Sequence, residues 1–270
     1  MPQKIAEQFV ADSKVKIEDS SASDKPLSSG NKEQDKAEVS RLAAAISEQQ
    51  QMFYASREHK LLVILQGMDT SGKDGTVNEV FARVNPQGIR IANFKAPTAV
   101  ELAHDYLWRV HQQVPEAGEI TVFNRSHYED VLITRVHDWI DDKECKRRYA
   151  QINDFERMLS ETGTIILKFF LHISKDEQKE RLQSRIDEPH KNWKFEIEDL
   201  EGRKNWDSYQ QVYQNALRAT STEHAPWYVV PADSKTHRNL VIAGIVLETL
   251  ESLKLKFPDP KPELKKIKFD

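Results

Sequence analysis

A lysine that follows a glycine-bracketed turn has the clearest chemistry in this sequence. Residues 67–75 read Gly-Met-Asp-Thr-Ser-Gly-Lys-Asp-Gly, and Lys73 comes directly after Gly72. In such a turn successive backbone N–H groups point into one concavity, and the lysine ammonium closes over phosphates bound there. The residues therefore predict a phosphate-binding loop in which Lys73 acts as a catalytic cation.

The loop departs from the common pattern G-x-x-x-x-G-K-[ST] at one position. Asp74 stands where a magnesium-binding hydroxyl is usual. A carboxylate at that position removes a metal ligand and adds negative charge beside the phosphates, so the metal must be held differently. A second carboxylate inside the loop, Asp69, is the natural substitute. The alternative is that Asp69 only stabilises the turn.

A second polar cluster follows the apolar run at residues 120–123. Many phosphate-loop enzymes hold magnesium there with an aspartate, but this chain has Asn124. Arg125 can chelate phosphate oxygens through its planar fork and so stabilise charge in the transferring group; the alternative is a structural ion pair. Glu129 reaches the same sheet edge as the loop and is a further candidate site residue. The alternative is that Glu129 only closes a helix start, because Ser126 and Glu129 have the spacing of a capping box.

A charged segment at residues 181–204 is the third candidate region. Residues 187–189, Asp-Glu-Pro, interrupt the preceding helical pattern, and bases and acids are mixed on both sides of them. A helical lid over the phosphates needs such cations, because closure must neutralise the transferring group and exclude water. A solvated charged hairpin has the same composition, and the charge pattern alone favours the hairpin.

The elements that position these residues follow from apolar runs separated by helical patterns. The loop lies between an apolar run at residues 61–65 and a stretch whose apolar residues have helical spacing. Strands that alternate with helices predict a parallel sheet with helices on both faces, and ligands collect at the carboxyl ends of its strands. We expect further strands at residues 89–94, 120–123, 165–173 and 227–230, and long flanking helices at residues 37–54 and 236–254.

Composition narrows the classes of function. The 270 residues, of which 39% are hydrophobic, are enough for one large α/β domain. A net charge of -4 argues against a protein that binds nucleic acid through bulk positive charge. The sequence has no apolar run long enough to predict a membrane span, and its one cysteine, Cys145, is typical of a reducing, cytoplasmic compartment.

The domain organisation is predicted from a change in composition near residue 35. Residues 11–35 are rich in Ser, Lys, Asp and Glu and have no apolar periodicity, so we expect residues 1–35 to form a disordered tail. Residues 36–270 then form one phosphate-loop kinase domain, which includes a helical lid at about residues 185–205.

Seven sequence blocks, in order between about residues 50 and 258, resemble the family-2 polyphosphate kinases. The blocks are GMDTSGKDG from Gly67, NPQG from Asn85, FKAP from Phe94, HDYLWR from His104, FNRSHY from Phe123, RIDEPHKNWK from Arg185 and APWYVVPAD from Ala225. Enzymes of this family move phosphoryl groups between inorganic polyphosphate and nucleotides. The resemblance implies a three-layer phosphate-loop kinase fold of the thymidylate-kinase type, with a five-stranded parallel sheet, helices on both faces and a helical lid.

The resemblance also implies ligands and roles for individual residues. The implied ligands are Mg²⁺, inorganic polyphosphate, AMP, ADP and ATP, and the implied assembly is a homo-oligomer. The implied catalytic residues are Asp69, Lys73, Arg125 and Arg185, and the candidate metal ligands are Asp69 and Glu129. The implied substrate-binding residues are Gly67, Thr70, Ser71, Gly72, Asp74, Gly75, Thr76, Lys95, Asn124, Glu129, Lys194 and Arg203.

Two departures from the commonest form of the family resemble the subgroup that accepts nucleoside mono- and diphosphates alike. Asn124 replaces an aspartate, and residues 127–130 read His-Tyr-Glu-Asp where many members have Trp-Tyr-Asn-Arg. We therefore expect phosphoryl transfer from polyphosphate to AMP and ADP, reversible with ATP. Two alternatives stay open: an NTP-dependent small-molecule kinase of the same fold, and a non-catalytic protein that binds polyphosphate or nucleotides.

Overall fold

Five parallel strands form one sheet in the part of the chain that the structure, a computed structural model, describes, which is residues 4–267. The strands are β1 (Lys60–Gln66), β2 (Ile89–Asn93), β3 (Ile120–Asn124), β4 (Thr164–His172) and β5 (Trp227–Pro231). Their order across the sheet is β2-β3-β1-β4-β5, and every neighbouring pair is parallel. The carboxyl ends of β1 and β3 therefore lie side by side, which is where both predicted polar clusters begin.

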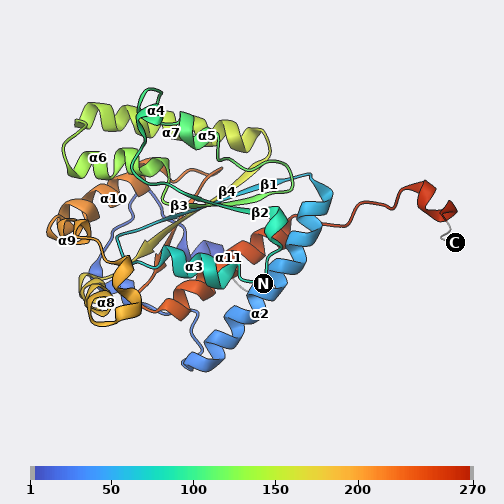
Figure 1. The fold of residues 1–270 in the computed structure, drawn as a ribbon, viewed down its shortest axis with the longest axis horizontal. Coiled ribbons are helices and arrows are strands. Elements are labelled where there is room, and N and C mark those ends of the chain that lie inside the picture. Colours follow the sequence, from blue (N-terminus) through green and yellow to red (C-terminus); the bar gives the residue numbers. More distant parts are fainter. Residues whose placement is uncertain (1–3, 268–270) are drawn as a thin grey trace.

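Helices cover both faces of the sheet and give the molecule three layers (Figure 1). The α-helices are α1 (Ile5–Phe9), α2 (Lys32–Ser56), α3 (Lys73–Val80), α4 (Ala99–Leu102), α5 (Trp108–His111), α6 (Ile133–Val136), α7 (Asp142–Glu161), α8 (Lys175–Asp187), α9 (Glu198–Lys204), α10 (Trp206–Thr220) and α11 (Lys235–Ser252). Short 3-10 helices are η1 (Asp19–Ser23), η2 (Pro86–Gly88), η3 (His127–Val131), η4 (Pro189–Lys194) and η5 (Pro262–Lys266). No helix in the described range combines the length and the apolar character needed to cross a membrane.

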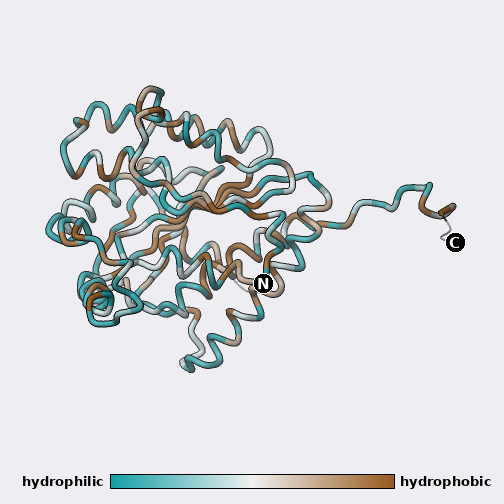
Figure 2. The backbone as a smooth tube through the Cα atoms, in the orientation of Figure 1, coloured by the Kyte–Doolittle hydropathy of each residue, from teal (hydrophilic) through white to brown (hydrophobic). Residues whose placement is uncertain are grey.

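Alternating strand side chains fill the two apolar layers. In β1, Leu61, Val63 and Leu65 pack with residues of α2, α3 and α11, whereas Leu62 and Ile64 pack with residues of α7 and α10. Both faces of β1 are covered, so its sequence is a continuous apolar run rather than an alternating one. Figure 2 shows these strands as the hydrophobic centre of the molecule.

The predicted α/β class and the predicted strands are confirmed, each strand to within a residue at either end. The first long helix, α2, begins before its predicted start at residue 37, because the Asn31 side chain caps it by accepting the N–H groups of Glu33 and Gln34. The last long helix, α11, is buried at every residue from His237 to Leu247, because α1, α2 and α3 pack on it as well as the sheet.

The prediction that residues 1–35 form a disordered tail is wrong for residues 4–35, and residues 1–3 lie outside the described range. Phe9 and Ala11 are buried, and Val10 forms an antiparallel bridge with Tyr228. The Ala11 N–H donates to the Trp227 carbonyl at 2.8 Å. The segment thus adds to the free edge of β5. Composition did not predict this, because unpaired backbone groups of an edge strand can hold a segment with few apolar side chains.

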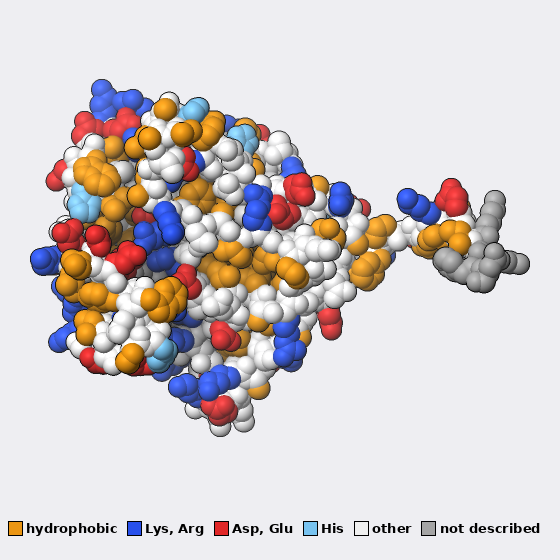
Figure 3. Space-filling model, viewed as in Figure 1, with side chains coloured by type: hydrophobic (Ala, Val, Ile, Leu, Met, Phe, Trp, Pro, Cys, Tyr) orange, Lys and Arg blue, Asp and Glu red, His pale blue; other side chains and the backbone are white. Residues whose placement is uncertain are grey.

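The chain beyond α11 stands clear of the body as an extended arm (Figures 1 and 3). Three large apolar side chains on this arm, those of Phe257, Leu264 and Ile267, are 62%, 54% and 53% exposed. The arm lies at the opposite end of the molecule from helices α8 and α9, so it takes no part in the site described next.

Candidate active site

The predicted phosphate loop lies between β1 and α3, at the carboxyl edge of the sheet. Gly67 and Gly72 have φ values of +151° and +104°, and Thr70 is also left-handed at +65°. A Cβ atom at Gly67 would lie 2.6 Å from the Leu171 carbonyl oxygen, and one at Gly72 would overlap the Arg238 guanidinium. Both glycines are therefore required by conformation and by close packing.

Lys73 is held against its own loop. Its Nζ donates to the carbonyl oxygens of Gly67 and Met68 at 2.8 and 3.3 Å. Burial and the nearby Arg125 charge lower the pKa of Lys73 to about 8, while the carboxylates of Asp69, Glu129 and Asp74 act in the opposite direction. The loop thus holds a cation that is only partly neutralised by the protein, as a site for a polyanion requires.

Arg125 comes directly after β3, and its backbone N–H donates to the Leu65 carbonyl at the end of β1, at 3.1 Å. Its Nη2 forms an ion pair with Asp69 Oδ1 at 2.9 Å. Burial opposes the charged form, but Glu129 and Asp69 outweigh it and raise the pKa of Arg125. The structural ion pair considered as an alternative does exist, and it joins two residues of the candidate site.

Glu129 faces this cluster and does not cap a helix. The Ser126 hydroxyl accepts the N–H of Tyr128, and the Glu129 N–H donates to the Ser126 carbonyl. The Gln66 amide is oriented so that its oxygen accepts the Ser126 N–H and its Nε2 donates to Glu129 Oε1, each at 3.1 Å. Burial raises the pKa of Glu129, despite the opposing charges of Arg125 and Lys73. The capping-box interpretation is therefore wrong.

Asp74, the departure from the common loop pattern, contacts Asn124, which stands where many phosphate-loop enzymes have an aspartate. Asn124 Nδ2 donates to Asp74 Oδ1 at 2.6 Å and to Asn93 Oδ1 at 3.0 Å. An aspartate at position 124 would place a second carboxylate against Asp74. The amide at position 124 is thus a neutral hydrogen-bond donor to the Asp74 carboxylate.

Three side chains that were not among the predicted site residues donate hydrogen bonds to backbone carbonyls of the loop; one of them, Arg181, begins the charged segment at residues 181–204. Gln178 and Arg181 of α8 and Arg238 of α11 donate to the carbonyls of residues 69, 70 and 71 at 3.3, 2.9 and 3.1 Å, respectively. No local pattern marks these residues, because only the packing of α8 and α11 beside the loop brings them together.

The predicted lid at residues 185–205 approaches the loop at Asp69. Arg185 Nη1 pairs with Asp199 Oδ2 at 2.9 Å and donates to the Lys194 carbonyl at 2.9 Å. Burial and the nearby Asp69 carboxylate raise the pKa of Asp199, and a Cβ atom on Gly202 would lie 3.5 Å from Asp69 Oδ2. The position favours the lid interpretation over a solvated hairpin. Figure 3 shows charged side chains of both signs at this end of the molecule.

Four predicted site residues of the outer segments form no side-chain hydrogen bond or ion pair with loop residues 67–75 in the described part of the chain. The Arg185 guanidinium is engaged within the segment itself. Lys194 Nζ lies 5.0 Å from the centre of the Trp193 ring, and Arg203 Nη1 donates to the Lys175 carbonyl at 2.6 Å. Lys95 is exposed after the end of β2. Their substrate roles therefore stay predictions, whereas Asp69, Lys73, Arg125 and Glu129 are gathered at the loop.

The loop has oxygen atoms suited to Mg²⁺ and phosphate. The buried hydroxyls of Thr70, Ser71 and Thr76 have no hydrogen-bond partner within the described chain. Residues 4–267 contain no cluster of three or more His, Cys, Asp or Glu side chains that would form a complete metal cage. Mg²⁺ commonly needs only one or two carboxylates besides water and substrate phosphates, so the carboxylates of Asp69 and Glu129 fit this ion.

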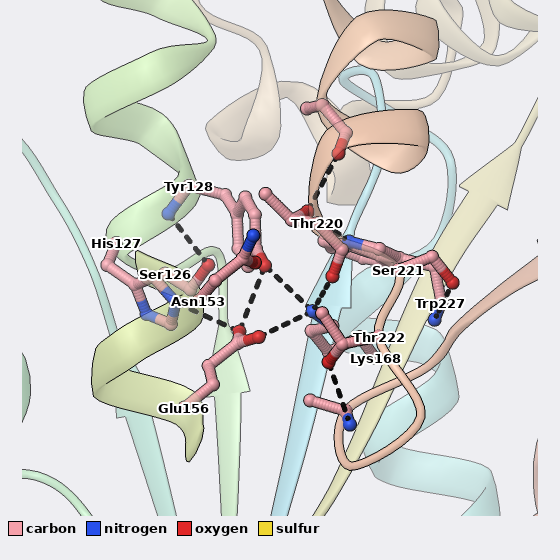
Figure 4. A network of polar contacts seen from close by, with 12 residues as sticks. Ser126, His127, Tyr128, Asn153, Glu156, Lys168, Thr220, Ser221, Thr222 and Trp227 are labelled. Carbon is pink, nitrogen blue, oxygen red and sulfur yellow. Dashed lines mark hydrogen bonds and ion pairs between the residues drawn. The ribbon is translucent and has the colours of Figure 1, made fainter. Parts of the chain in front are cut away.

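A buried polar network lies beneath the segment that carries Arg125 and Glu129 (Figure 4). Lys168 of β4 donates to Tyr128 Oη at 2.8 Å and to Glu156 Oε2 at 2.6 Å, and its side chain is fully buried. His127 Nε2 lies 3.3 Å from Glu156 Oε1. Burial acts against the charge of Glu156, but Lys168 and His127 outweigh it and lower the pKa of Glu156. The network anchors residues 127 and 128 between the two site residues.

Comparison with known proteins agrees with this site. A sequence model of the family described as polyphosphate kinase 2 (PPK2) matches residues 29–258. An AMP/ADP-polyphosphate phosphotransferase of Meiothermus ruber is 56% identical over 218 residues, which cover 81% of this chain and 82% of that protein. An ADP-polyphosphate phosphotransferase of Rhodopseudomonas palustris is 47% identical over 233 residues, covering 82% and 81%.

The fold leads to the same family. The crystal structure of polyphosphate kinase 2 from Arthrobacter aurescens TC1 superposes with a TM-score of 0.93 at 42% sequence identity, over 98% of this chain and 95% of that chain. The phosphate loop, its lysine and the Arg125 cluster occupy the carboxyl edge of that shared sheet. The chain belongs to the polyphosphate kinase 2 family.

Proposed function

We propose that this chain transfers phosphoryl groups from inorganic polyphosphate to AMP and to ADP, and that ATP drives the reverse reaction. The observation that carries the proposal is the meeting of Lys73, Arg125, Asp69 and Glu129 at the phosphate loop. The names of similar proteins support the substrates, since the Meiothermus ruber relative is an AMP/ADP-polyphosphate phosphotransferase. Family membership makes the chain an enzyme, a phosphotransferase.

The geometry suits a reaction in which the protein aligns phosphates and neutralises their charge. Phosphoryl transfer needs little covalent chemistry from the protein. Loop N–H groups and Lys73 bind the phosphates, and the Arg125 fork stabilises charge on the transferring group. A phosphate acceptor is already ionised near neutral pH. Asp69 therefore orients the acceptor through Arg125 and does not act as a general base.

Mg²⁺ is the proposed cofactor, because phosphotransferases of this kind need a divalent metal. Asp69 and Glu129 would hold it together with phosphate oxygens, and the ion would supply charge neutralisation at those oxygens. The unpartnered hydroxyls of Ser71 and Thr76 lie in the same loop and support an oxygen-rich site.

A homo-oligomeric assembly and a cytoplasmic location belong to the same proposal. The one cysteine, Cys145, is a buried free thiol, and this supports a reducing compartment. Light scattering on the purified protein measures the mass of the assembly directly.

The test is product analysis with long-chain polyphosphate, Mg²⁺ and either AMP or ADP. We expect ADP from AMP and ATP from ADP, only when polyphosphate is present, and no product from a Lys73→Ala variant that keeps the wild-type melting temperature. Transfer from ATP to a small molecule without polyphosphate would instead identify a small-molecule kinase. Binding of polyphosphate without any nucleotide product would show a non-catalytic binding protein.

A further inference from the structure

Arg238 places a buried positive charge directly behind the phosphate loop. Its side chain extends from α11, is 2% exposed, and donates through Nη1 to the Ser71 carbonyl at 3.1 Å. A Cβ atom on Gly72 would overlap its guanidinium, and one on Gly75 would lie 3.2 Å from Nη2. Because Gly72 and Gly75 have no Cβ atom, the loop backbone packs directly against the guanidinium.

This guanidinium has no carboxylate within ion-pair distance among residues 4–267. Its remaining hydrogen bonds run from Nε and Nη2 to the neutral Asn239 amide oxygen, at 3.1 and 3.0 Å. Burial, together with the nearby cation of Arg181, lowers the pKa of Arg238 to about 9, although the Glu79 carboxylate, beyond ion-pair distance, acts in the opposite direction. The group is therefore protonated near neutral pH. A buried charge without a partner is costly, which calls for a counter-charge from elsewhere.

The hydrogen bond to Ser71 also orients the loop. In a trans peptide the carbonyl and the following N–H point in opposite directions. Because the Ser71 carbonyl faces Arg238, the N–H of Gly72 points away from Arg238, toward the other side of the loop. Arg181 Nη1 donates to the same Ser71 carbonyl at 3.3 Å and to the Thr70 carbonyl at 2.9 Å, so both cations hold this part of the backbone. Backbone N–H groups turned to one side in this way form an anion-binding concavity.

We propose that Arg238 is a positioning residue of the phosphate loop, whose guanidinium fixes the Ser71–Gly72 peptide and supplies a buried charge that has no carboxylate in direct contact and that the bound polyanion balances. The residue acts through the loop and does not touch the substrate. The inference rests on the proposed function, since polyphosphate is the anion concerned. It predicts that an internal counter-ion for Arg238 stabilises the free protein and weakens polyphosphate binding.

The Asn239→Asp substitution supplies that counter-ion with almost no change of shape, because Asn239 Oδ1 already accepts two bonds from Arg238. Asn215→Asp on α10 is the matched control: Asn215 is exposed, its Oδ1 accepts from Gln211 at 3.0 Å, and the change in net charge is the same. Titration calorimetry with long-chain polyphosphate and fixed Mg²⁺, without nucleotide, gives the Kd. Thermal denaturation gives the melting temperature of the free protein.

We expect Asn239→Asp to raise the melting temperature of the free protein and to raise the Kd for polyphosphate roughly tenfold, as for one charge neutralised near the site, while Asn215→Asp changes neither. An unchanged Kd, a lower melting temperature, or failure to fold would each overturn the inference. Failure of the wild-type protein to bind polyphosphate would overturn the proposed function as well. Normal binding by the wild type with an unchanged Kd in Asn239→Asp would overturn only the inference about Arg238.

Direct replacement of Arg238 tests its charge at similar side-chain length. Arg238→Lys keeps the charge, whereas Arg238→Met has nearly the same length as the lysine and no charge. We expect the Kd for polyphosphate to rise more in the Met variant than in the Lys variant. Equal values would show that the charge plays no part. The Asn239→Asp measurement decides the proposal even where a replacement of Arg238 does not fold.

Discussion

At the scale of single residues, the site sets two cations, Lys73 and Arg125, against the carboxylates of Asp69 and Glu129. Arg125 is paired with Asp69, while Lys73 is bonded to carbonyl oxygens of its own loop. Among the described residues Lys73 has no carboxylate within ion-pair distance, so a bound phosphate can become its direct negative partner. Because a lysine can lose its proton in the accessible pH range and an arginine cannot, this balance depends on pH through Lys73.

The first prediction is a loss of polyphosphate affinity at alkaline pH. Burial, together with Arg125, lowers the pKa of Lys73 in the free protein to about 8, so the cation is present below that pH and disappears above it. We expect kcat/KM for polyphosphate to be constant from pH 7 and to fall above about pH 8. The substrate phosphates are already ionised there. A profile that stays flat to about pH 9.5 would contradict a lowered pKa.

The second prediction concerns the contact between Asn124 and Asp74. Asn124→Asp places two carboxylates where a hydrogen bond of 2.6 Å now lies, so we expect a lower melting temperature and a higher KM for polyphosphate. Adding Asp74→Asn to Asn124→Asp exchanges the acid and the amide, and should restore most of the lost stability. Thermal denaturation of the two single variants and the double variant gives the coupling. Additive losses would show that the two side chains do not interact.

The third prediction assigns Glu129 to the choice of acceptor. In the proposed function a carboxylate there would recruit Mg²⁺ to AMP, whose shorter phosphate chain contributes less charge of its own. An amide binds metal less strongly. Glu129→Gln should therefore lower kcat/KM for AMP more than for ADP, at saturating polyphosphate and matched Mg²⁺. The glutamine at position 129 retains an oxygen atom that accepts the hydrogen bond from Gln66 Nε2. An unchanged ratio of the two specificity constants would leave Glu129 with a structural role alone.

At the scale of elements, the segment before α2 completes the edge of the sheet beside β5. Phe9 is 7% exposed and belongs to the apolar layer that contains α2 and α11, whereas its neighbour Val10 is 47% exposed. The bridge between Val10 and Tyr228 uses backbone atoms, so the Val10 side chain adds little to it. Substitutions at these two adjacent residues therefore distinguish the contribution of side-chain packing from that of backbone pairing.

The fourth prediction compares alanine substitutions at Phe9 and Val10. Phe9→Ala should lower the free energy of unfolding by about 2–4 kcal/mol, because it removes a buried aromatic side chain near one end of the core. Val10→Ala is the matched control and should cost less than about 0.5 kcal/mol. Urea denaturation measures both. Equal effects would mean that the N-terminal segment is not packed in solution as it is in the structure.

At the scale of the whole molecule, the sequence predicts what is contiguous and misses what packing assembles. The five strands and the phosphate loop could be recognised because each is a run of neighbouring residues with its own pattern. The supports of the loop could not, since Arg181 and Arg238 come from two helices far apart in sequence. The same limit explains Glu129, whose local spacing predicted a cap although its partner, Gln66, lies at the end of another strand.

The Lys168–Glu156 ion pair shows what such long-range assembly contributes to stability. Both side chains are fully buried, and the pair joins β4 to α7 with a separation of 2.6 Å between Nζ and Oε2. Breaking a buried pair leaves one uncompensated charge and typically costs about 3–5 kcal/mol. Lys168 also bonds to Tyr128 and to the Thr220 carbonyl of α10, so its loss reaches three elements around the sheet.

The last prediction is therefore that replacing Lys168 reverses the pH dependence of the stability that Glu156 contributes. In the wild-type protein Lys168 and His127 outweigh burial and lower the pKa of Glu156, so this contribution to stability is present above the ordinary carboxyl pKa and is lost as pH falls through the lowered one. In Lys168→Met the Glu156 carboxylate keeps its contacts with His127 and Tyr128 but loses its ammonium partner, so it takes up a proton more easily. We expect this variant to lose about 3–5 kcal/mol near neutral pH and to recover part of it near pH 5. Urea denaturation at several pH values measures the effect, with exposed Lys179→Met as control. A loss that is the same at every pH would show that Glu156 carries no uncompensated charge in the variant.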